Sequence, residues 1–344
     1  MSIIGLTKPR SVSNDVLPTI SDITVTADGD DFYRIERFNA DNVTKFNLSS
    51  PATPLWQYST MDAGAAGSSN PHSIVVASDD KAYILRHGSK SVWIVNPSAT
   101  DEANFKMGEI DLSAYDAADG IPNMSQGIII GNKLFITTSA LDASWIPQQA
   151  HLVVIDINTD TEIDTELSAE PAIKAIPLPI RGPGQLDYAA DSNKIYLQAA
   201  GRIGFPDWGI KGEYDGGILS IDPDTYAIET LVDDGDDTNH PYGNITSLAI
   251  SSSNKGYFVG YNEDTDVNNL YSFNPNTGDV APDTVAGVFG KDLADIAIAP
   301  TGNLWVASRT DFGIIVIDPA TDTAEESLIS TGSLAPDAIV FTDF

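Results

Sequence analysis

The amino-acid sequence predicts an all-β protein, a closed β-propeller of about seven four-stranded blades that forms one domain over residues 1–344. Three observations support this prediction. Short apolar strand starts recur roughly every 40 to 60 residues, turns rich in Asp, Asn and Gly follow most of them, and a similar phrase ends the third strand of most units. The same pattern also fits six full blades with a thin closing blade.

Each repeat opens on a polar residue that enters a short apolar strand. The equivalent positions are Asp22, Ser73, Gln126, Gln185, Ser247, Asp295 and Asp337. Seven starts predict seven units, but the last unit contains only PDAIVFTDF. We therefore expect the N-terminal segment MSIIGLTKPRSVSND to pair with this last segment, because closing the ring removes the unpaired edges of the sheets.

A hairpin and a third strand follow most starts. The turns and the aromatic second strands after them read ADGDDFYRI, SDDKAYIL, IGNKLFIT, DSNKIYLQ, SSNKGYFV and PTGNLWVA. Asn, Asp and Gly favour such tight turns because they tolerate positive φ. The third strands end in VNPSATDE at Val95, IDINTDTE at Ile155, IDPDTYAI at Ile221, FNPNTGDV at Phe273 and IDPATDTA at Ile317. Side-chain hydrogen bonds from Thr and Asp stabilise a turn in these phrases, and a fourth strand is expected after it.

These phrases and the rhythm of the strands resemble the bacterial and archaeal YVTN-type repeat propellers, which are related to the quinoprotein amine dehydrogenase-like superfamily. The resemblance covers residues 15–344 and rests on phrases such as IDPATDT at Ile317. It implies a closed propeller. Such propellers include enzymes, binding proteins and surface scaffolds, so the resemblance leaves the activity open.

The composition excludes several kinds of partner and site. The chain has 49 acidic and 18 basic residues, which gives a formal net charge of -31 at pH 7. Such a surface repels phosphate backbones and anionic membranes, so nucleic acid is not expected as a partner. The chain contains no cysteine, which excludes disulfides, thiolate metal sites and cysteine nucleophiles. No apolar run reaches the roughly 18 residues of a membrane span, so no transmembrane segment is expected.

We expect the protein to work outside the cytoplasm, in the periplasm, as a secreted protein or at the cell surface. An acidic surface favours solubility in salty surroundings, and chains of this size without cysteine occur among exported bacterial proteins. The first residues lack the long apolar stretch of a secretory signal, so we expect the signal or anchor to be absent from this chain. We also expect a monomer.

The four histidines are candidate metal ligands. His72, His87, His151 and His240 lie in segments just before first strands, after a second strand or at the end of an insertion, which should share one side of a propeller. Neutral imidazole binds metal ions and acts as an acid or base near neutral pH. The alternative is four ordinary surface or capping histidines, because no HxH or HxxxH spacing groups them.

Basic residues are scarce, so their grouping is informative. Arg37, His87 and Arg309 each stand four residues after the aromatic residue of a second strand. In a ring, their blades flank the closure, so we expect them to form a cationic sector together with Arg86. Such a sector would bind a carboxylate, sulfate or phosphate group. In the alternative, each arginine pairs with a neighbouring acidic residue.

Two long insertions are candidate binding loops. They read LDASWIPQQAH from Leu141 and AGRIGFPDWGIKGEYDGG from Ala200, and they supply Trp145, Trp208 and Tyr214 as candidate ligand-binding residues. Long loops on a rigid scaffold often carry binding sites, and exposed aromatic rings suit sugars, peptides or aromatic ligands. The alternative is a hydrophobic plug that seals one end of the ring.

No cofactor follows with certainty from the sequence. The acidic loops DDGDDTNH from Asp233 and NEDTDVNN from Asn262 offer the oxygen ligands that calcium prefers, but neither has the spacing of an EF-hand. A structural calcium ion is therefore an open alternative. The sequence contains no GxSxG, HExxH or P-loop motif.

These features favour a non-enzymatic binding or interaction protein that takes a small-molecule, glycan or protein ligand on the side of the insertions. The alternative is a metal-dependent hydrolase of lactonase type with its site at the mouth of the central channel. Its site would use polar residues at strand starts, namely Asp22, Gln126, Gln185, Asp295 and Asp337. Because a wet channel favours polar residues in any case, this pattern leaves enzymatic activity open.

Overall fold

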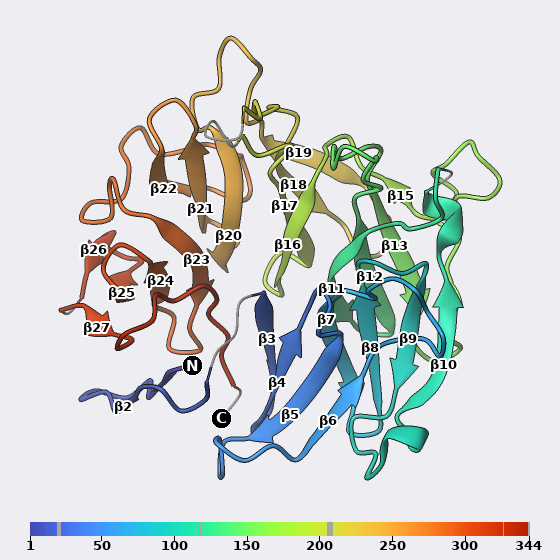
Figure 1. Ribbon diagram of the computed structural model, residues 1–344. Coiled ribbons are helices and arrows are strands. Elements are labelled where there is room, and N and C mark those ends of the chain that lie inside the picture. The colour runs from blue at the N-terminus through green and yellow to red at the C-terminus, as the bar shows by residue number, and fades with distance from the viewer. Residues whose placement is uncertain (19–21, 117, 205–208, 326, 343–344) are drawn as a thin grey trace. The chain divides into compact units, whose positions relative to one another are not determined.

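The computed structural model describes residues 1–18, 22–116, 118–204, 209–325 and 327–342. It is 45% strand and 2% helical, which confirms the all-β prediction. The strands form a six-blade β-propeller arrangement (Figure 1). The chain divides into two compact units. Unit 1 comprises Met1–Pro18 and Ile180–Phe341, and unit 2 comprises Thr19–Pro179 and Thr342–Phe344.

Unit 2 contains three antiparallel sheets. The first is formed by β3 (Ile23–Asp28), β4 (Asp31–Glu36), β5 (Asn42–Asn47) and β6 (Trp56–Ser59). The second is formed by β7 (Pro71–Ser78), β8 (Lys81–Arg86), β9 (Ser91–Val95) and β10 (Lys106–Asp111). The third is formed by β11 (Met124–Ile130), β12 (Lys133–Thr138) and β13 (His151–Asp156), with β14 (Thr161–Glu162) and β15 (Ile176–Pro177) both paired to β13. Two 3-10 turns, η1 (Glu102–Asn104) and η2 (Ser113–Tyr115), flank β10.

Unit 1 contains the other three blade sheets. The first is formed by β16 (Pro183–Ala189), β17 (Lys194–Ala199), β18 (Gly217–Ile221) and β19 (Ile228–Val232). The second is formed by β20 (Asn244–Ser252), β21 (Lys255–Asn262) and β22 (Val267–Phe273). The third is formed by β23 (Leu293–Ile298), β24 (Leu304–Ser308), β25 (Gly313–Asp318), β26 (Thr323–Ala324) and β27 (Ile329–Ser330). A short ribbon of β1 (Ile3–Ile4) and β2 (Val12–Ser13) lies in the same unit.

The expected hairpin turns are present. Asp28 at the end of β3 pairs with Asp31 at the start of β4, so only Gly29 and Asp30 connect the two strands. Gly29 has a φ of 53°, a conformation that glycine adopts without the steric cost of a side chain. The turn residues therefore set the register of this hairpin, as the sequence predicts.

The number of blades is six, and the expected seventh unit is not a blade. Within the described residues, the segment from Pro336 to Thr342 forms no strand, and β1 pairs with β2 instead of with this segment. Ile339 and Phe341 pack against the apolar cluster of the β23–β25 sheet, where Ile4 and Leu6 also pack. The segment is too short to build a sheet, so it buries its apolar residues on an existing one.

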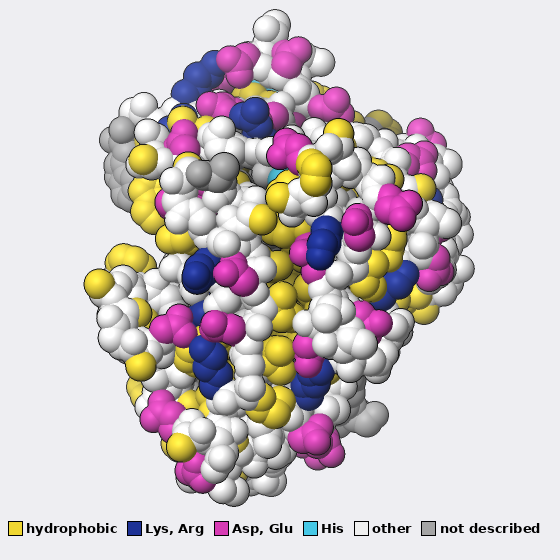
Figure 2. Space-filling view, turned by 90° about the vertical axis from the view of Figure 1, so that its right-hand side faces the viewer, with side chains coloured by type: hydrophobic (Ala, Val, Ile, Leu, Met, Phe, Trp, Pro, Cys, Tyr) yellow, Lys and Arg dark blue, Asp and Glu magenta, His cyan; other side chains and the backbone are white. Residues whose placement is uncertain are grey.

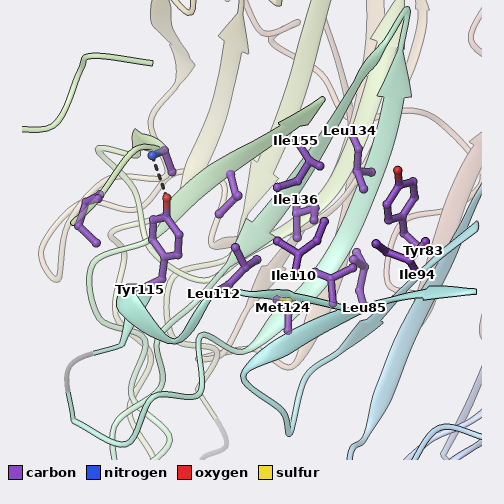
Figure 3. Packing of buried hydrophobic residues seen from close by; sticks show 14 residues of the cluster. Tyr83, Leu85, Ile94, Ile110, Leu112, Tyr115, Met124, Leu134, Ile136 and Ile155 are labelled. Atoms are coloured by element: carbon purple, nitrogen blue, oxygen red, sulfur yellow. Dashed lines mark hydrogen bonds between the residues drawn. The ribbon is translucent and has the colours of Figure 1, made fainter. Parts of the chain in front are cut away.

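The core of each unit lies between neighbouring sheets. In unit 2, one cluster is formed by side chains from the second and third sheets (Figure 3), including Leu85, Ile110 and Ile136. Tyr115 from η2 lies at the edge of this cluster, where its hydroxyl oxygen accepts a hydrogen bond from the Ala175 amide at 2.9 Å. Such interlocking of apolar side chains makes each unit a rigid support for its loops.

The recurring phrases at the ends of the third strands share a backbone conformation. The same position of four phrases has positive φ, and its occupants are Asp160, Tyr226, Gly278 and Asp322. Gly and Asp tolerate this conformation better than most residues, which explains their recurrence in the pattern. The phrase is therefore a turn motif of the fold.

In two phrases the aspartate also binds the preceding blade. A tyrosine hydroxyl and a lysine ammonium group of that blade's second strand both donate to its carboxylate. The contacts are those of Tyr83 and Lys81 with Asp160 and those of Tyr257 and Lys255 with Asp322, at 2.5 to 2.8 Å. The phrases thus join neighbouring blades, which assigns them a structural role.

Replacing Tyr257 by phenylalanine is expected to lower the free energy of unfolding by about 1–2 kcal/mol, because the lost hydrogen bond ends on a carboxylate. Urea denaturation measures the change. The control is Tyr188→Phe, which removes an exposed hydroxyl that donates to Asn193 and should cost less than about 0.5 kcal/mol. Equal losses in the two variants would contradict a joining role for the Tyr257 contact.

Candidate functional site

In unit 2, two histidines that are distant in the sequence meet at the ends of adjacent strands. Pro71 in β7 pairs with Arg86 in β8, and the register shifts between Pro71 and Ser73. This bulge gives His72 its own direction, toward the residue that follows β8. The rings of His72 and His87 stack with their centroids 4.3 Å apart and their planes inclined by 13°.

Both imidazoles are neutral at physiological pH. Burial, followed by the effects of His87 and Arg37, lowers the pKa of His72 to about 2. Burial and then Arg37 lower the pKa of His87 to about 4. Neutral rings offer both a hydrogen-bond donor and an acceptor, so this pair suits an uncharged polar ligand better than an anion.

Arg37 lies beside the histidine pair, and its guanidinium group binds Asp22. Its Nη2 and Nε atoms lie 2.5 and 2.7 Å from Asp22 Oδ1. The other carboxylate oxygen of Asp22 accepts a hydrogen bond from the Phe38 amide at 3.0 Å. An anionic ligand would therefore have to compete with Asp22 for Arg37.

Asn123 joins the histidine pair to the first insertion. Its side-chain amide donates to the His87 carbonyl at 3.3 Å, and its Oδ1 accepts from the Leu141 amide at 2.7 Å. Asn123 holds a φ of 54°, a conformation that asparagine tolerates comparatively well. The loop after β8 and the loop after β12 are thus held together.

The loop after β12 is an ordered turn that presents Trp145. One carboxylate oxygen of Asp142 accepts hydrogen bonds from the Ser144 and Ile146 amides, and the other accepts from the side chain of Gln148. Trp145 has a φ of 62° and its side chain is 70% exposed. A non-glycine residue in this strained conformation is held there by its surroundings. We call Arg37, His72, His87 and Trp145, together with the buried Asn123 that links the loops of His87 and Trp145, the His–Trp surface.

Arg86, which was grouped with the surface cations, is fully buried in its blade. It donates to the Thr60 carbonyl, to Asp62 and to both the carbonyl and the hydroxyl of Ser91, and its guanidinium lies 4.4 Å from the centre of the Trp93 ring. Every residue of β8 from Ala82 to Arg86 is buried, so both faces of this strand are covered and Arg86 lies inside the blade. It is therefore part of the blade and not of the His–Trp surface.

The remaining predicted cation, Arg309, lies in unit 1 and binds two carboxylates. Its Nε lies 2.6 Å from Asp337 and its Nη1 lies 3.2 Å from Asp292. On the face shown in Figure 2, lysine and arginine side chains generally lie next to aspartate or glutamate side chains. Arg37 and Arg309 are thus each paired with acidic residues, as the alternative expectation stated. The partners themselves could not be identified from the sequence.

The other predicted residues are dispersed. The His240 ring stacks on the Tyr214 ring in unit 1 with the centroids 3.9 Å apart, and His151 lies against Tyr115 in unit 2. Trp208 lies outside the described residues. In the described part of the chain, no group of three or more His, Asp and Glu side chains is close enough to hold a metal ion.

Three polar residues at strand starts of unit 1 bind one another. Gln185 Nε2 donates to Asp295 Oδ1 at 2.8 Å, and the Ser247 hydroxyl donates to Gln185 at 2.9 Å and to Asp295 at 3.3 Å. Asp295 also accepts from the amide of Ile339 at 2.7 Å. Burial raises the pKa of Asp295 to about 6, against the opposing effect of these hydrogen bonds. The network fastens the C-terminal segment to the strand starts.

A second polar group in unit 1 surrounds the insertion after β17. Burial first, and then Asp233 and Asp215, raise the pKa of Asp234 to about 7. Burial and the nearby Glu263 raise the pKa of Tyr214 to about 12. Such perturbed groups are typical of functional sites.

The sequence analysis missed the asparagines that organise these loops. Asn70, Asn123 and Asn244 each stand three residues before a strand start, at Ser73, Gln126 and Ser247. This repeat was visible in the aligned units. Its meaning was not, because the side-chain partners of Asn123 and Asn244 lie on other loops.

No family model and no curated protein matches this chain. Hydrazine synthase of Kuenenia stuttgartiensis aligns at 15% identity and a TM-score of 0.61, over 96% of this chain and 85% of that chain. A putative 6-phosphogluconolactonase from Bacteroides fragilis aligns at 17% identity and 0.56, over 92% and 84%. The extracellular domain of a putative one-component system from B. thetaiotaomicron aligns at 12% identity and 0.56, over 94% of this chain and 36% of that chain.

At these identities the similarity shows the fold alone. The chain is a six-blade β-propeller. Among the residues that the structure describes, no helix is long and apolar enough to cross a bilayer.

Proposed function

We propose that this propeller is a non-enzymatic binding protein that works outside the cytoplasm and binds a glycan with the His–Trp surface. The observation that carries the proposal is Trp145, whose side chain is 70% exposed although an ordered turn holds it. Exposing a large aromatic ring to water costs free energy. A ring that is held outward on a rigid loop is suited to stacking on a ligand.

The charges of the His–Trp surface favour a polyhydroxylated ligand without a full negative charge. The two imidazoles are neutral, and Arg37 is bound to Asp22. Hydroxyl groups can donate to and accept from neutral imidazoles without displacing a carboxylate. An acidic glycan would have to replace Asp22 on Arg37 and approach a chain with a net charge of -31.

The proposed location and kinship rest on more general features. The acidic chain suits an extracytoplasmic setting, and one protein with a similar fold is an extracellular domain. The IDPATDT-like phrases support kinship with the YVTN-type propellers. Cell fractionation of the native organism with an antibody against this chain tests the location.

Replacing Trp145 by alanine is expected to weaken glycan binding about tenfold or more, because a stacked aromatic residue contributes much of the binding free energy of such a site. The probes are neutral and uronic-acid-containing oligosaccharides, screened first and then measured by isothermal titration calorimetry. The melting temperature should change little, since the side chain is exposed.

The control variant is Phe289→Ala, which removes a comparably exposed aromatic ring (68%) from unit 1 and should leave binding unchanged. Loss of binding in both variants would indicate nonspecific adhesion. Unchanged binding in Trp145→Ala would refute the proposed site, and preferential binding of uronic acids would refute the preference for neutral glycans.

A further inference from the structure

In unit 1, three segments meet around the base of the second insertion. They are the loop after β17, the segment after β19 and the start of β20. The Gly216 amide donates to Asp234 Oδ2 at 3.2 Å, which joins the first two segments. Asn244 at the start of β20 donates to the Ala200 and Glu213 carbonyls at 2.9 and 3.1 Å, which joins the first and third.

Each segment contributes a buried side-chain oxygen that has no hydrogen-bond partner among the described residues. These atoms are Oδ1 of Asp215, Oδ1 of Asp234 and Oδ1 of Asn244. The side chains of Asp234 and Asn244 are fully buried. A buried oxygen without a donor is costly, so three in one region indicate an absent binding partner.

The orientation of Asn244 is determined by its surroundings. Its amide nitrogen faces backbone carbonyls, so a flipped amide would place oxygen against oxygen. Oδ1 therefore faces the opposite way, toward Gly212. A Cβ atom built on Gly212 would lie 3.2 Å from Asn244 Oδ1 and 2.8 Å from Glu263 Oε2. A side chain at this position would crowd both oxygens, so glycine lets the backbone of the second insertion approach them closely, and the Gly212 amide donates to Glu263 Oε2 at 2.8 Å.

The basic side chains in and around these loops are engaged with other atoms. Arg202 in the second insertion binds Glu213 at 3.6 Å. Arg181 binds Asp215 through the opposite oxygen, Oδ2, at 3.3 Å. Lys211 binds the exposed Asp237 at 2.8 Å. Among the described residues, no ammonium or guanidinium group therefore contacts the three oxygens.

The aspartates of the acidic loop that begins at Asp233 differ in what their carboxylates bind. Asp233 and Asp236 accept hydrogen bonds from amides of their own turn, those of Gly235 and of Thr238 and Asn239 respectively. Their carboxylates stabilise the turn. Asp234, between them, is the one that points inward.

From these oxygens we infer a calcium site at the base of the second insertion, with Asp215, Asp234 and Asn244 as protein ligands. Calcium takes six to eight oxygen ligands in flexible geometry, including amide and backbone carbonyl oxygens and water. Magnesium requires a smaller and more regular octahedron, which suits this mixed set less well. The bound ion would connect the base of the second insertion to β20. This site is independent of the glycan binding proposed for unit 2.

The test compares wild type with Asp234→Asn in thermal melts, with calcium and after treatment with EDTA. Calcium should raise the melting temperature of the wild type by several degrees, because an ion that binds only the folded state stabilises it. Asp234→Asn keeps the shape and removes the charge. It should fold in EDTA and should lose the calcium response. Titration with terbium, excited through nearby aromatic residues such as Tyr214, should show about tenfold weaker binding by the variant.

The control is Asp264→Asn, which removes one exposed charge nearby and should respond to calcium as wild type does. If Asp234→Asn does not fold, Asp215→Asn provides the same comparison. A wild-type melt that calcium leaves unchanged would overturn the proposal. A calcium response that survives in Asp234→Asn as well as in Asp264→Asn would also overturn it, because the effect would then belong to the acidic surface in general.

Discussion

Replacing Arg86 by methionine is expected to destabilise the protein by about 3 kcal/mol, because several buried oxygen acceptors lose their donor. The fully buried guanidinium satisfies the Thr60 carbonyl, Ser91 and Asp62, and it stacks on Trp93. Methionine fills much of the volume but donates no hydrogen bond. The variant would leave several acceptors unsatisfied inside the blade. Denaturation in urea measures the loss.

The comparison is Arg37→Met, in which an arginine at the surface is removed from Asp22. Both partners are about one third exposed, so the expected loss is below about 1 kcal/mol. Comparable losses in the two variants would show that burial does not distinguish these arginines. A small loss of stability in Arg86→Met would show that Arg86 is not a structural element of its blade.

The second large effect concerns the pH dependence caused by Asp295. Its pKa is about 6 in the folded protein, because burial disfavours the charged form, and 3.8 is its ordinary value. Between these values the folded state holds a proton that the unfolded state has released. Stability due to Asp295 is therefore present below pH 4 and is lost as the pH rises to 6, by about 3 kcal/mol in total.

The measurement compares wild type with Asp295→Asn in urea at pH values from 4 to 7. Asparagine does not titrate, so wild type should be most stable relative to this variant at pH 4, where Asp295 holds its proton. The difference should shrink by about 2–3 kcal/mol by pH 7. Subtracting the free energies of unfolding of the two proteins at each pH cancels the opposite trend that His72 and His87 contribute to both. The lowered pKa values of these histidines make the stability of both proteins fall below about pH 6.5.

The control is the exposed Asp283, whose change to asparagine should give a pH profile parallel to that of wild type. A constant difference between wild type and Asp295→Asn across this range would mean that Asp295 titrates alike in the folded and unfolded states. The buried network would then not perturb its ionisation.

Much of the architecture could be predicted from local patterns. The turn at Gly29 and the phrase position occupied by Asp160 and Asp322 depend on backbone conformations that few residue types adopt easily. The number of blades could not be predicted in the same way, because the final segment is apolar enough for a strand. Packing decided otherwise, since Ile339 and Phe341 could be buried on the β23–β25 sheet.

The candidate sites depended much more on the three-dimensional structure. Arg86 and His87 are neighbours in the sequence, yet one is buried in the blade and the other contributes to the His–Trp surface. His72 joins His87 through a bulge that the spacing of the histidines does not indicate. Trp145 was identified as a candidate from its position in a long insertion, but its exposure follows from the hydrogen bonds of Asp142.

The sequence by itself determined the strands, their turns and the repeat, because these follow from side-chain alternation and from the conformations available to adjacent residues. The tertiary structure decided which polar groups are satisfied. Arg37 could have paired with several nearby acids, and Asp22 was selected by the register of β3 and β4. Asp234 is buried and its Oδ1 has no hydrogen-bond partner in the described part of the chain, whereas the carboxylate of its neighbour Asp233 accepts a hydrogen bond within a turn. Pairing and burial depend on groups brought together from distant segments, and local sequence does not encode those distances.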